Sequence, residues 1–472
     1  MCGIVCTNTN TKPDVLAASV AHRGTYTPEC VFRDGFTFCH TLMPVQGNSP
    51  VKQPFGDGAP YTLLFQGELW DHPGSASDTE YLFQELCATN DVRGTVNRLN
   101  GMFAFVFSNG TDLWFASDIF GEQPLYFYHG GTRGFFPCLS IASEMKQLLV
   151  CGALLNKIKP CAPGKLYHYS FATGALEVET YHAFDYTQAR TDVVDYEKIR
   201  KLLRRSCKKK YGAVALQQTA LLLSGGVDSA IIAYELSKLG ITQAFTVSID
   251  LDSIDFRTAE VAAAQCGLHL TKVLCKTLDP DRSIVMSESK NRSVVEEYVC
   301  HLALAKCLAE QNYRVVFTGS GADEIFVGYP YYLRFFSRNN MSLLQSKLIE
   351  SYHSRELRVL NKVYMSYAIE CRSPFLDRTL ANYALTLDIN KCLVDKGRMK
   401  AALRDAYCDV IASAQNEKII AGRSMGVIDY FAERNGGMDA RVYHPRYAEI
   451  FSSVGEVFGL LEKVRAVEYE IV

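Results

Sequence analysis

The chain has 472 residues, 48% of them hydrophobic and 21% charged, with 49 basic and 51 acidic side chains and a formal net charge of −2. A chain of this length is expected to form two or three domains, each with its own core. Because the charges balance, nothing attracts the protein at long range to nucleic acid or to an anionic membrane, and we expect neither as a partner. No apolar run reaches the ~18 residues of a membrane span, and residues 1–8 lack the basic and apolar segments of a secretory signal.

The sixteen cysteines contain no Cys-x-x-Cys pair and no zinc-type spacing. Unpatterned thiols in this number are typical of a reducing compartment, where they serve mostly as small buried hydrophobes. We therefore expect a cytoplasmic protein without a structural metal.

Residues 1–185 favour antiparallel strands. Short β-type runs end in turn residues, as at Tyr61–Phe65, Met102–Ser108 and Asp112–Ala116, and the clearest helical pattern is Thr79–Leu86. This part is predicted to be an α+β domain of layered antiparallel sheets.

Residues 196–472 favour an α/β domain with a parallel sheet, because apolar strands alternate with long helical patterns. Tyr186–Glu197, polar and mixed in charge, is the predicted linker, and Met438–Val472 suggest a packed helical end. The basic run Arg204–Lys210 is expected to be a solvated helix face rather than a polyanion site. The predicted strands are Thr219–Leu223, Ala244–Ile249, Leu268–Leu274 and Arg314–Thr318, and the predicted helices are Asp228–Leu239 and Arg257–Gln265, with Gly240 and Gly267 at helix ends.

Cys2 directly follows the initiator methionine. Removal of that methionine would leave a cysteine with a free α-amine of pKa near ~8, able to act as general base for its own thiol. Taken alone, Cys2 is better interpreted as one of many thiols placed there by chance.

Cys2 is followed by a series of further motifs in the first part of the chain. They are His22-Arg23-Gly24, Gln66-Gly67-Glu68, Asp78, Asn100–Phe105, Asp118-x-x-Gly121-x-x-Pro124-Leu125-Tyr126 and Ala142–Lys146. Their order and spacing resemble the class II glutamine amidotransferase domain, an N-terminal-nucleophile fold, in the form found at the front of glutamine-hydrolysing asparagine synthetases.

The resemblance implies that Cys2 attacks the side-chain amide of glutamine, forms a thioester and releases ammonia. Gln66 and Gly67 would supply the donors for the oxyanion. Glu68 and Asp78 would hold the α-amine of glutamine, and Thr41 would also bind glutamine.

Two features depart from the family pattern on this side. The family has Asn where this chain has Gln66, and the extra methylene could misplace the donor by more than ~1 Å. The family's loop arginine, which binds the α-carboxylate of glutamine, is missing from His40–Val45. Such a loss removes roughly 1.5–3 kcal/mol of binding, and Arg23 or Arg33 could replace it.

The run Leu221–Ala230 joins an apolar strand to an amphipathic helix through Ser224-Gly225-Gly226-Val227-Asp228-Ser229. Paired glycines let backbone N–H groups approach an anion, and the helix start adds its positive dipole end. The motif resembles the ATP-pyrophosphatase loop and is not a Walker A loop.

This second resemblance implies cleavage of ATP between its α- and β-phosphates, with activation of a carboxylate as an acyl-adenylate. Asp228 and Asp323 would hold Mg²⁺, and Lys400 would stabilise charge at the α-phosphate. The residues implied in ATP binding are Leu223, Ser224, Gly225, Gly226, Asp228, Ser229, Val247, Thr318 and Gly319. The segments Glu370–Asp377 and Gly397–Arg404 also match asparagine synthetases.

Two further departures concern the second substrate. Asparagine synthetases have Glu at the position of Ser320, and serine is unsuited to general-base work near neutral pH. The stretch Ser293–Glu297 lacks the Thr and Arg that the synthetases place in their substrate region. Its two carboxylates, Glu296 and Glu297, would disfavour an anionic aspartate unless a cation compensates. They could instead be exposed helix residues.

Three interpretations remain. The first is a divergent glutamine-dependent asparagine synthetase using glutamine, ATP and aspartate. The second is a related adenylating ligase or amidotransferase with another carboxylate or amine. The third is a non-catalytic descendant that retains the scaffold, against which the intact Cys2, Asp228, Asp323 and Lys400 argue. A homodimer is compatible with each of them.

Overall fold

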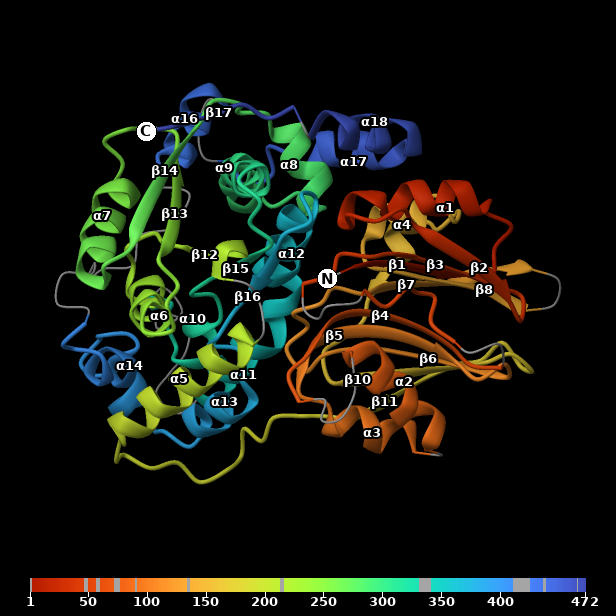
Figure 1. Ribbon diagram of the computed structural model, residues 1–472, viewed down its shortest axis with the longest axis horizontal. Coiled ribbons are helices and arrows are strands. Elements are labelled where there is room, and N and C mark those ends of the chain that lie inside the picture. Colours follow the sequence, from red (N-terminus) through yellow and green to blue (C-terminus); the bar gives the residue numbers. More distant parts are fainter. Residues whose placement is uncertain are drawn as a thin grey trace.

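Figure 1 presents the computed structural model of the chain. It describes residues 2–45, 50–56, 60–71, 77–89, 91–133, 136–212, 216–330, 341–410, 425–435, 439–464 and 466–472. Two antiparallel sheets lie on one side of the molecule, and a third, mostly parallel sheet lies on the other.

The N-terminal part is a sandwich of two antiparallel sheets covered by helices. The first sheet has the order β2-β3-β1-β8-β7-β9 and the second has the order β11-β10-β6-β5-β4. The strands are β1 (Gly3–Thr7), β2 (Glu29–Arg33), β3 (Phe36–Thr41), β4 (Thr62–Leu69), β5 (Gly101–Ser108), β6 (Asp112–Ser117), β7 (Tyr126–Arg133), β8 (Phe136–Ala142), β9 (Lys159–Pro160), β10 (Lys165–Ser170) and β11 (Leu176–Thr180). Helices α1 (Pro13–Val20) and α4 (Met145–Leu149) cover the first sheet, and α2 (Asp78–Ala88) and α3 (Val92–Arg98) cover the second (Figure 1).

Strand β4 illustrates why this sandwich forms. Successive side chains of a strand point to opposite faces. Leu64 accordingly packs between the sheets with Ile4 and Phe115, while Leu63 and Phe65 pack against α2 and α3. The predicted layered α+β architecture is confirmed.

The C-terminal part contains a six-stranded sheet in the order β16-β15-β12-β13-β14-β17. Its strands are β12 (Thr219–Leu222), β13 (Gln243–Ser248), β14 (His269–Cys275), β15 (Val315–Phe317), β16 (Glu370–Arg372) and β17 (Tyr469–Ile471). The first five are parallel, whereas β17 pairs antiparallel with β14. The sheet is therefore mixed. The predicted packed helical end is present at His444–Ser452 and Val454–Val464, and the three-residue strand β17 follows it.

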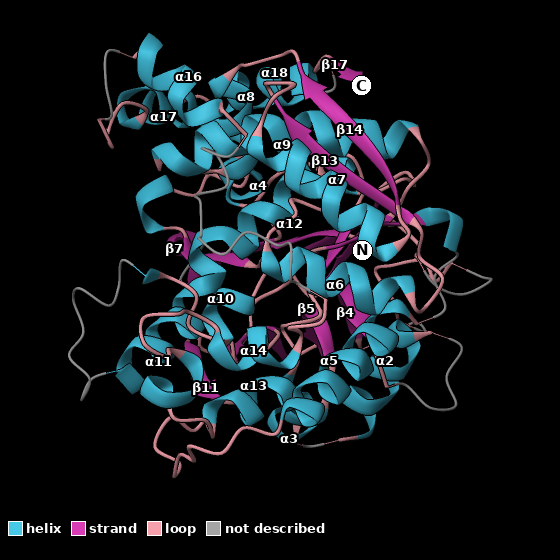
Figure 2. Ribbon diagram, turned by 90° about the vertical axis from the view of Figure 1, so that its left-hand side faces the viewer, coloured by secondary structure: helices cyan, strands magenta, loops and turns pink. Residues whose placement is uncertain are grey.

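Helices cover both faces of this sheet, as expected for an open α/β domain. Helices α6 (Val227–Ser237) and α7 (Ile254–Cys266) pack in the core on one face, and α8 (Pro280–Ser287), α9 (Arg292–Glu310) and α16 (Val427–Arg434) pack on the other (Figure 2). The remaining helices are α5 (Tyr196–Tyr211), α10 (Ala322–Ile325), α11 (Met341–Tyr352), α12 (Arg358–Met365), α13 (Arg378–Leu385), α14 (Ala401–Ala406), α17 (His444–Ser452) and α18 (Val454–Val464). Among the described residues, no helix is both long and apolar enough to cross a membrane.

The cysteines are mostly buried, as expected, and Cys408 is an exposed exception. Cys30 and Cys39 face each other across β2 and β3 and form a disulfide. Their spacing in the sequence did not predict this bond.

The basic run of α5 is only partly solvated. Arg204, Arg205 and Lys208 are exposed, but Lys210 is buried and its Nζ lies 3.0 Å from Glu122 Oε1 in the N-terminal part. Lys209 Nζ contacts Asp377 and donates to Asn100 Oδ1 at 3.4 Å. The prediction of a fully solvated face is wrong here, because two of its lysines join the two parts of the molecule.

Candidate active sites

The first candidate site surrounds Cys2, which is buried at the start of β1. Burial raises the pKa of the Cys2 thiol, and the nearby carboxylates of Asp78 and Glu68 add to the rise, while a hydrogen bond from the Met43 backbone opposes it. Cys2, Glu68 and Asp78 therefore share one site, although they come from three segments of the sequence. Asp78 is held at the start of α2, where its carboxylate accepts hydrogen bonds from the backbone N–H groups of Thr79 at 2.7 Å and of Leu69 at 3.4 Å.

Gly67 lies beside this site with a positive φ of 119°. A Cβ atom at this position would lie 2.0 Å from the backbone oxygen of Met102 on β5, so only glycine fits. The side chain of the preceding Gln66 is buried and bonded within the protein. Its amide nitrogen donates to Pro124 O at 2.8 Å, and its oxygen accepts from Ser143 Oγ at 2.5 Å.

The residues considered for the carboxylate of glutamine are mostly engaged elsewhere. Arg23 is fully buried and donates to Cys2 O at 3.2 Å, to Glu144 Oε1 at 2.7 Å and to Asn361 Oδ1 at 2.9 Å. Arg33 donates to Tyr61 O and Thr62 Oγ1. The Thr41 hydroxyl donates to Tyr26 O at 3.0 Å. Arg23 thus uses all three of its guanidinium nitrogens within the protein.

The second candidate site lies at the carboxyl end of β12, where an open α/β sheet gathers its ligands. The turn before α6 contains Ser224, whose hydroxyl lies 3.2 Å from the Ser229 hydroxyl. Gly225 has a φ of 76°, and a Cβ there would lie 2.2 Å from the backbone of Thr258. Gly226 has ordinary backbone angles and only Ser224 Oγ near its Cβ position, at 3.4 Å. The turn is therefore held against α7, while Ser224 is exposed and Gly226 is partly exposed.

Asp228, Asp323 and Lys400 converge beside this turn. Lys400 Nζ lies 2.6 Å from Asp228 Oδ2 and 2.8 Å from Asp323 Oδ1. Burial, the largest single effect, lowers the pKa of Lys400, but the two carboxylates together outweigh it and the net pKa is raised above its usual value. Two carboxylates that share one cation form the hard-oxygen ligand set that suits Mg²⁺.

The other residues implied in ATP binding line the same edge of the sheet. Leu223 N–H donates to Phe245 O at 2.8 Å, and Val247 is buried on β13. Thr318 N–H donates to Arg372 O at 3.0 Å. A Cβ on Gly319 would lie 2.8 Å from both Asp228 Cβ and Ser229 N, so this glycine lets the segment after β15 lie against the start of α6.

The family models match almost all of this architecture. A glutamine amidotransferase domain model matches residues 1–184, and an asparagine synthase model matches residues 198–348 and 337–417. The chain is a divergent member of the glutamine-hydrolysing asparagine synthetase family.

Two relatives by sequence agree with this membership. The chain is 24% identical to the asparagine synthetase [glutamine-hydrolyzing] of Mus musculus, over 83% of this chain and 77% of that protein. It is 26% identical to the probable asparagine synthetase [glutamine-hydrolyzing] of Schizosaccharomyces pombe, over 84% and 77%. A solved structure of the glutamine phosphoribosylpyrophosphate amidotransferase from B. subtilis, complexed with ADP and GMP, is 14% identical and covers 68% of this chain and 82% of its own, with a TM-score of 0.31.

The positions that depart from the synthetases have local partners. The backbone N–H of Ser320 donates to Thr318 Oγ1 at 3.3 Å. Glu296 is fully buried and accepts from Arg292 Nε at 2.8 Å, so the alternative of an exposed helix residue is wrong for Glu296. Glu297, one residue on, is half-buried, with its Oε1 3.9 Å from His301 Nε2.

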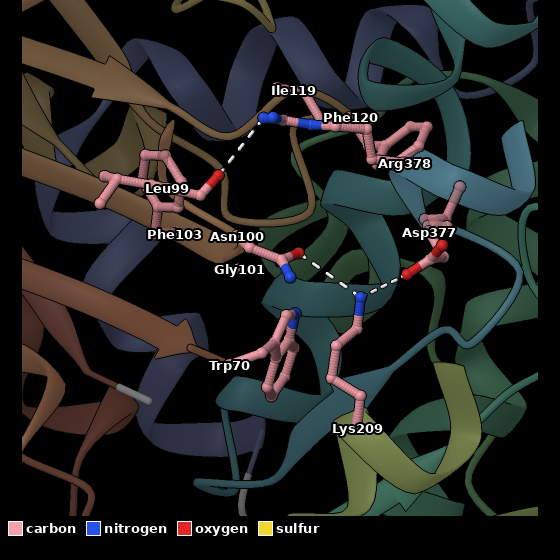
Figure 3. A pocket seen from close by; sticks show the side chains of 11 residues that line it. Trp70, Leu99, Asn100, Gly101, Phe103, Ile119, Phe120, Lys209, Asp377 and Arg378 are labelled. Carbon is pink, nitrogen blue, oxygen red and sulfur yellow. Dashed lines mark hydrogen bonds and ion pairs between the residues drawn. The ribbon is translucent and has the colours of Figure 1, made fainter. Parts of the chain in front are cut away.

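A small cavity lies between the amidotransferase and synthetase domains (Figure 3). Lys209 reaches into it between Asn100 and Asp377, and Arg378 donates to Leu99 O at 3.3 Å. None of the residues predicted for catalysis or substrate binding lines this cavity. It is a feature of the domain interface.

Sequence reasoning missed two residues that shape the sites. A Cβ on Gly328 would lie 1.7 Å from Asp323 Oδ1 and 2.6 Å from Lys400 Cε, so this glycine makes room for that ion pair. Arg372 of β16 reaches the amidotransferase domain, where its Nη2 lies 3.8 Å from Glu68 Oε1. Both stand inside segments that match the family, but only the three-dimensional contact reveals what they do.

Proposed function

We propose that the chain is a glutamine-dependent, ATP-consuming carbon–nitrogen ligase. The amidotransferase domain releases ammonia from glutamine at Cys2, and the synthetase domain adenylates a carboxylate and amidates it, releasing AMP and pyrophosphate. The observation that carries this proposal is the convergence of Asp228, Asp323 and Lys400 beside the phosphate-binding turn, in a chain that also gathers Cys2, Glu68 and Asp78.

In the amidotransferase domain, the Cys2 thiol loses its proton to the α-amine that methionine removal exposes. The sulfur attacks the amide carbon of glutamine, and the amine returns the proton to the departing ammonia. Water then hydrolyses the thioester to glutamate. The Gly67 N–H is the proposed donor to the oxyanion, with Gln66 as its neighbour in β4, and Glu68 and Asp78 hold the α-ammonium group.

In the synthetase domain, Ser224, Gly225, Gly226 and Ser229 hold the pyrophosphate portion of ATP. Asp228 and Asp323 would hold Mg²⁺, which supplies positive charge for the departing pyrophosphate. Lys400 serves as a fixed positive charge rather than as an acid, because the two carboxylates keep it protonated. Leu223, Val247, Thr318 and Gly319 frame the nucleotide.

Aspartate is the proposed acceptor, as the names of the relatives suggest. The alternative acceptor is another carboxylate, and Ser320 is the observation that favours it. Serine cannot take a proton from the attacking ammonia near neutral pH. The proposal also includes a cytoplasmic location, Mg²⁺ as the metal and a homodimer as a compatible assembly.

The deciding experiment offers the purified chain ATP, Mg²⁺, glutamine and aspartate, and follows products by mass spectrometry. Asparagine, AMP and pyrophosphate are expected. If AMP forms only with another carboxylate, that carboxylate replaces aspartate as the proposed acceptor and the ligase activity stands. Formation of ADP and inorganic phosphate would refute the adenylation step.

Two variants separate the sites. Cys2→Ala should abolish glutamine-dependent turnover and leave ammonia-dependent turnover intact. Asp228→Asn should abolish AMP formation and leave glutamate release intact. Equal loss of both activities in either variant would contradict two separate centres.

A further inference from the structure

Arg372 is a buried synthetase-domain side chain that points into the amidotransferase domain. It ends β16, and its side chain is fully buried. Nε donates to Glu370 Oε1 at 2.5 Å, and Nη1 contacts the backbone oxygens of Lys210 and Tyr211. Nη2 forms an ion pair with Glu68 at 3.8 Å but makes no hydrogen bond within the described residues. Nη2 is thus directed at Glu68, and its hydrogen-bonding capacity is still available.

Glu68 lies in surroundings that disfavour its charge. Burial raises the pKa of Glu68 well above its usual range, and the neighbouring carboxylates of Glu370 and Asp78 raise it further. Arg372 is the side chain that opposes this rise. A carboxyl group that takes up a proton becomes neutral and loses the charge-assisted bond to an ammonium group.

The contact also ties the two sites together through a short path. The side chain of Arg372 faces Glu68, while its backbone oxygen accepts from the N–H of Thr318 in the nucleotide-binding edge. The guanidinium lies 5.2 Å from the Trp70 ring centroid, which closes the amidotransferase side of the contact. The amine-binding end of one site is therefore completed by a residue of the other domain.

We infer that Arg372 is a positioning residue of the amidotransferase site, which favours the charged form of the Glu68 carboxyl group that binds the α-ammonium of glutamine, so that glutamine binding depends on the docked synthetase domain. The inference rests on the proposed use of glutamine at Cys2. It goes beyond that proposal, because it assigns part of glutamine recognition to the second domain.

The test measures glutamine affinity as a function of pH by calorimetry, in the full chain carrying Cys2→Ala so that no hydrolysis is needed. Removing Arg372 alone would leave Glu370 buried without its guanidinium partner. We therefore compare Glu370→Gln with the double variant Glu370→Gln/Arg372→Gln. The substitution Arg372→Gln keeps an N–H donor for the carbonyls of Lys210 and Tyr211.

The double variant should bind glutamine about tenfold more weakly than Glu370→Gln at pH 7, the change made by one pKa unit. This difference in glutamine affinity between the two variants should disappear as the pH rises, because Glu68 then ionises without Arg372. Glu370→Gln alone should extend tight binding to lower pH than the parent chain, because a repelling charge is gone. Ammonia-dependent AMP formation and the unfolding transition, measured in parallel, report whether the domains remain intact.

An affinity difference of equal size at every pH, or no difference, would overturn the inference. If Arg372 had a purely structural role, its effect on glutamine affinity would not depend on the protonation of Glu68. The proposed function fails in a different way. Tight, pH-dependent glutamine binding to the Cys2→Ala chain, combined with no glutamate release from the Cys2 chain, would contradict the hydrolysis and leave the role of Arg372 standing.

Discussion

Several charged side chains are buried in this molecule, and each lies against an oppositely charged residue from a distant part of the sequence. Lys400 is nearly buried between Asp228 and Asp323, and Lys210 is buried against Glu122. A buried charge that loses its partner is strongly destabilising. The identity of each residue at these sites is therefore constrained by its neighbours as much as by any substrate.

Gly67 is constrained by backbone space alone. Gly67→Ala should reduce glutamine hydrolysis at least tenfold and lower the melting temperature, because its Cβ would lie 2.0 Å from Met102 O at a φ of 119°. Gly35→Ala is the matched control, since Gly35 also has a positive φ but has no atom within 4 Å of its Cβ position. The control should lose only about 1 kcal/mol. Equal behaviour of the two variants in glutamate release would contradict the proposed role of Gly67.

At the scale of elements, the turn between β12 and α6 uses its two glycines for different purposes. Gly225 allows the turn to touch α7, while Gly226 leaves space on the open side. Substitutions at these two neighbouring glycines should therefore have different effects, one on folding and the other on nucleotide binding.

Gly225→Ala should lower the melting temperature, because its Cβ would lie 2.2 Å from the Thr258 backbone at a φ of 76°. Gly226→Ala should leave the melting temperature nearly unchanged and raise the KM for ATP severalfold, since backbone near a phosphate must stay accessible. Thermal unfolding and the pyrophosphate release rate distinguish the two. A Gly226→Ala chain with unaltered KM would place the phosphates elsewhere.

Sequence patterns located the elements that have long apolar or glycine-rich signals. The expected helix Arg257–Gln265 lies inside α7, and the expected strand Met102–Ser108 lies inside β5. Strands β16 and β17 were missed because their three residues, Glu-Cys-Arg and Tyr-Glu-Ile, form no apolar run, unlike the Val-Val-Phe of the equally short β15. Local pattern reading also places no residue beside its distant partners, which is why the contact of Arg372 with Glu68 was not predicted.

At the scale of the whole molecule, the two domains are joined by buried ionic contacts. The run in α5 was expected to face solvent because its charges suit an exposed helix. The partners of its last two lysines, Glu122 and Asn100, lie 88 and 109 residues away along the chain. Lys362 of α12 adds another contact. Its Nζ lies 2.9 Å from Glu288 Oε2 in the same domain and 3.5 Å from the Tyr126 hydroxyl of the amidotransferase domain.

The Glu122–Lys210 pair makes the stability of the joined domains depend on pH. Burial raises the pKa of Glu122 to about 7, although Lys210 at 3.0 Å lowers it and Asp118 raises it slightly. Two tendencies therefore compete at this pair, and the burial of the carboxyl group prevails. Because the folded pKa lies above the unfolded value, the contribution of Glu122 is fully present below pH ~4.5 and is lost as the pH rises through about 7.

Glu122→Gln removes this titration while its side-chain oxygen can still accept from Lys210. The unfolding free energy of the parent chain minus that of the variant should fall by about 3 kcal/mol between pH 4.5 and pH 8, following the shift of 1.36 kcal/mol per pKa unit. Denaturant unfolding across this pH range measures the difference, with Glu177→Gln on the exposed part of β11 as the surface control. If this difference in unfolding free energy rises with pH, the attraction of Lys210 outweighs the cost of burying the charged Glu122. The ionised pair would then stabilise the interface.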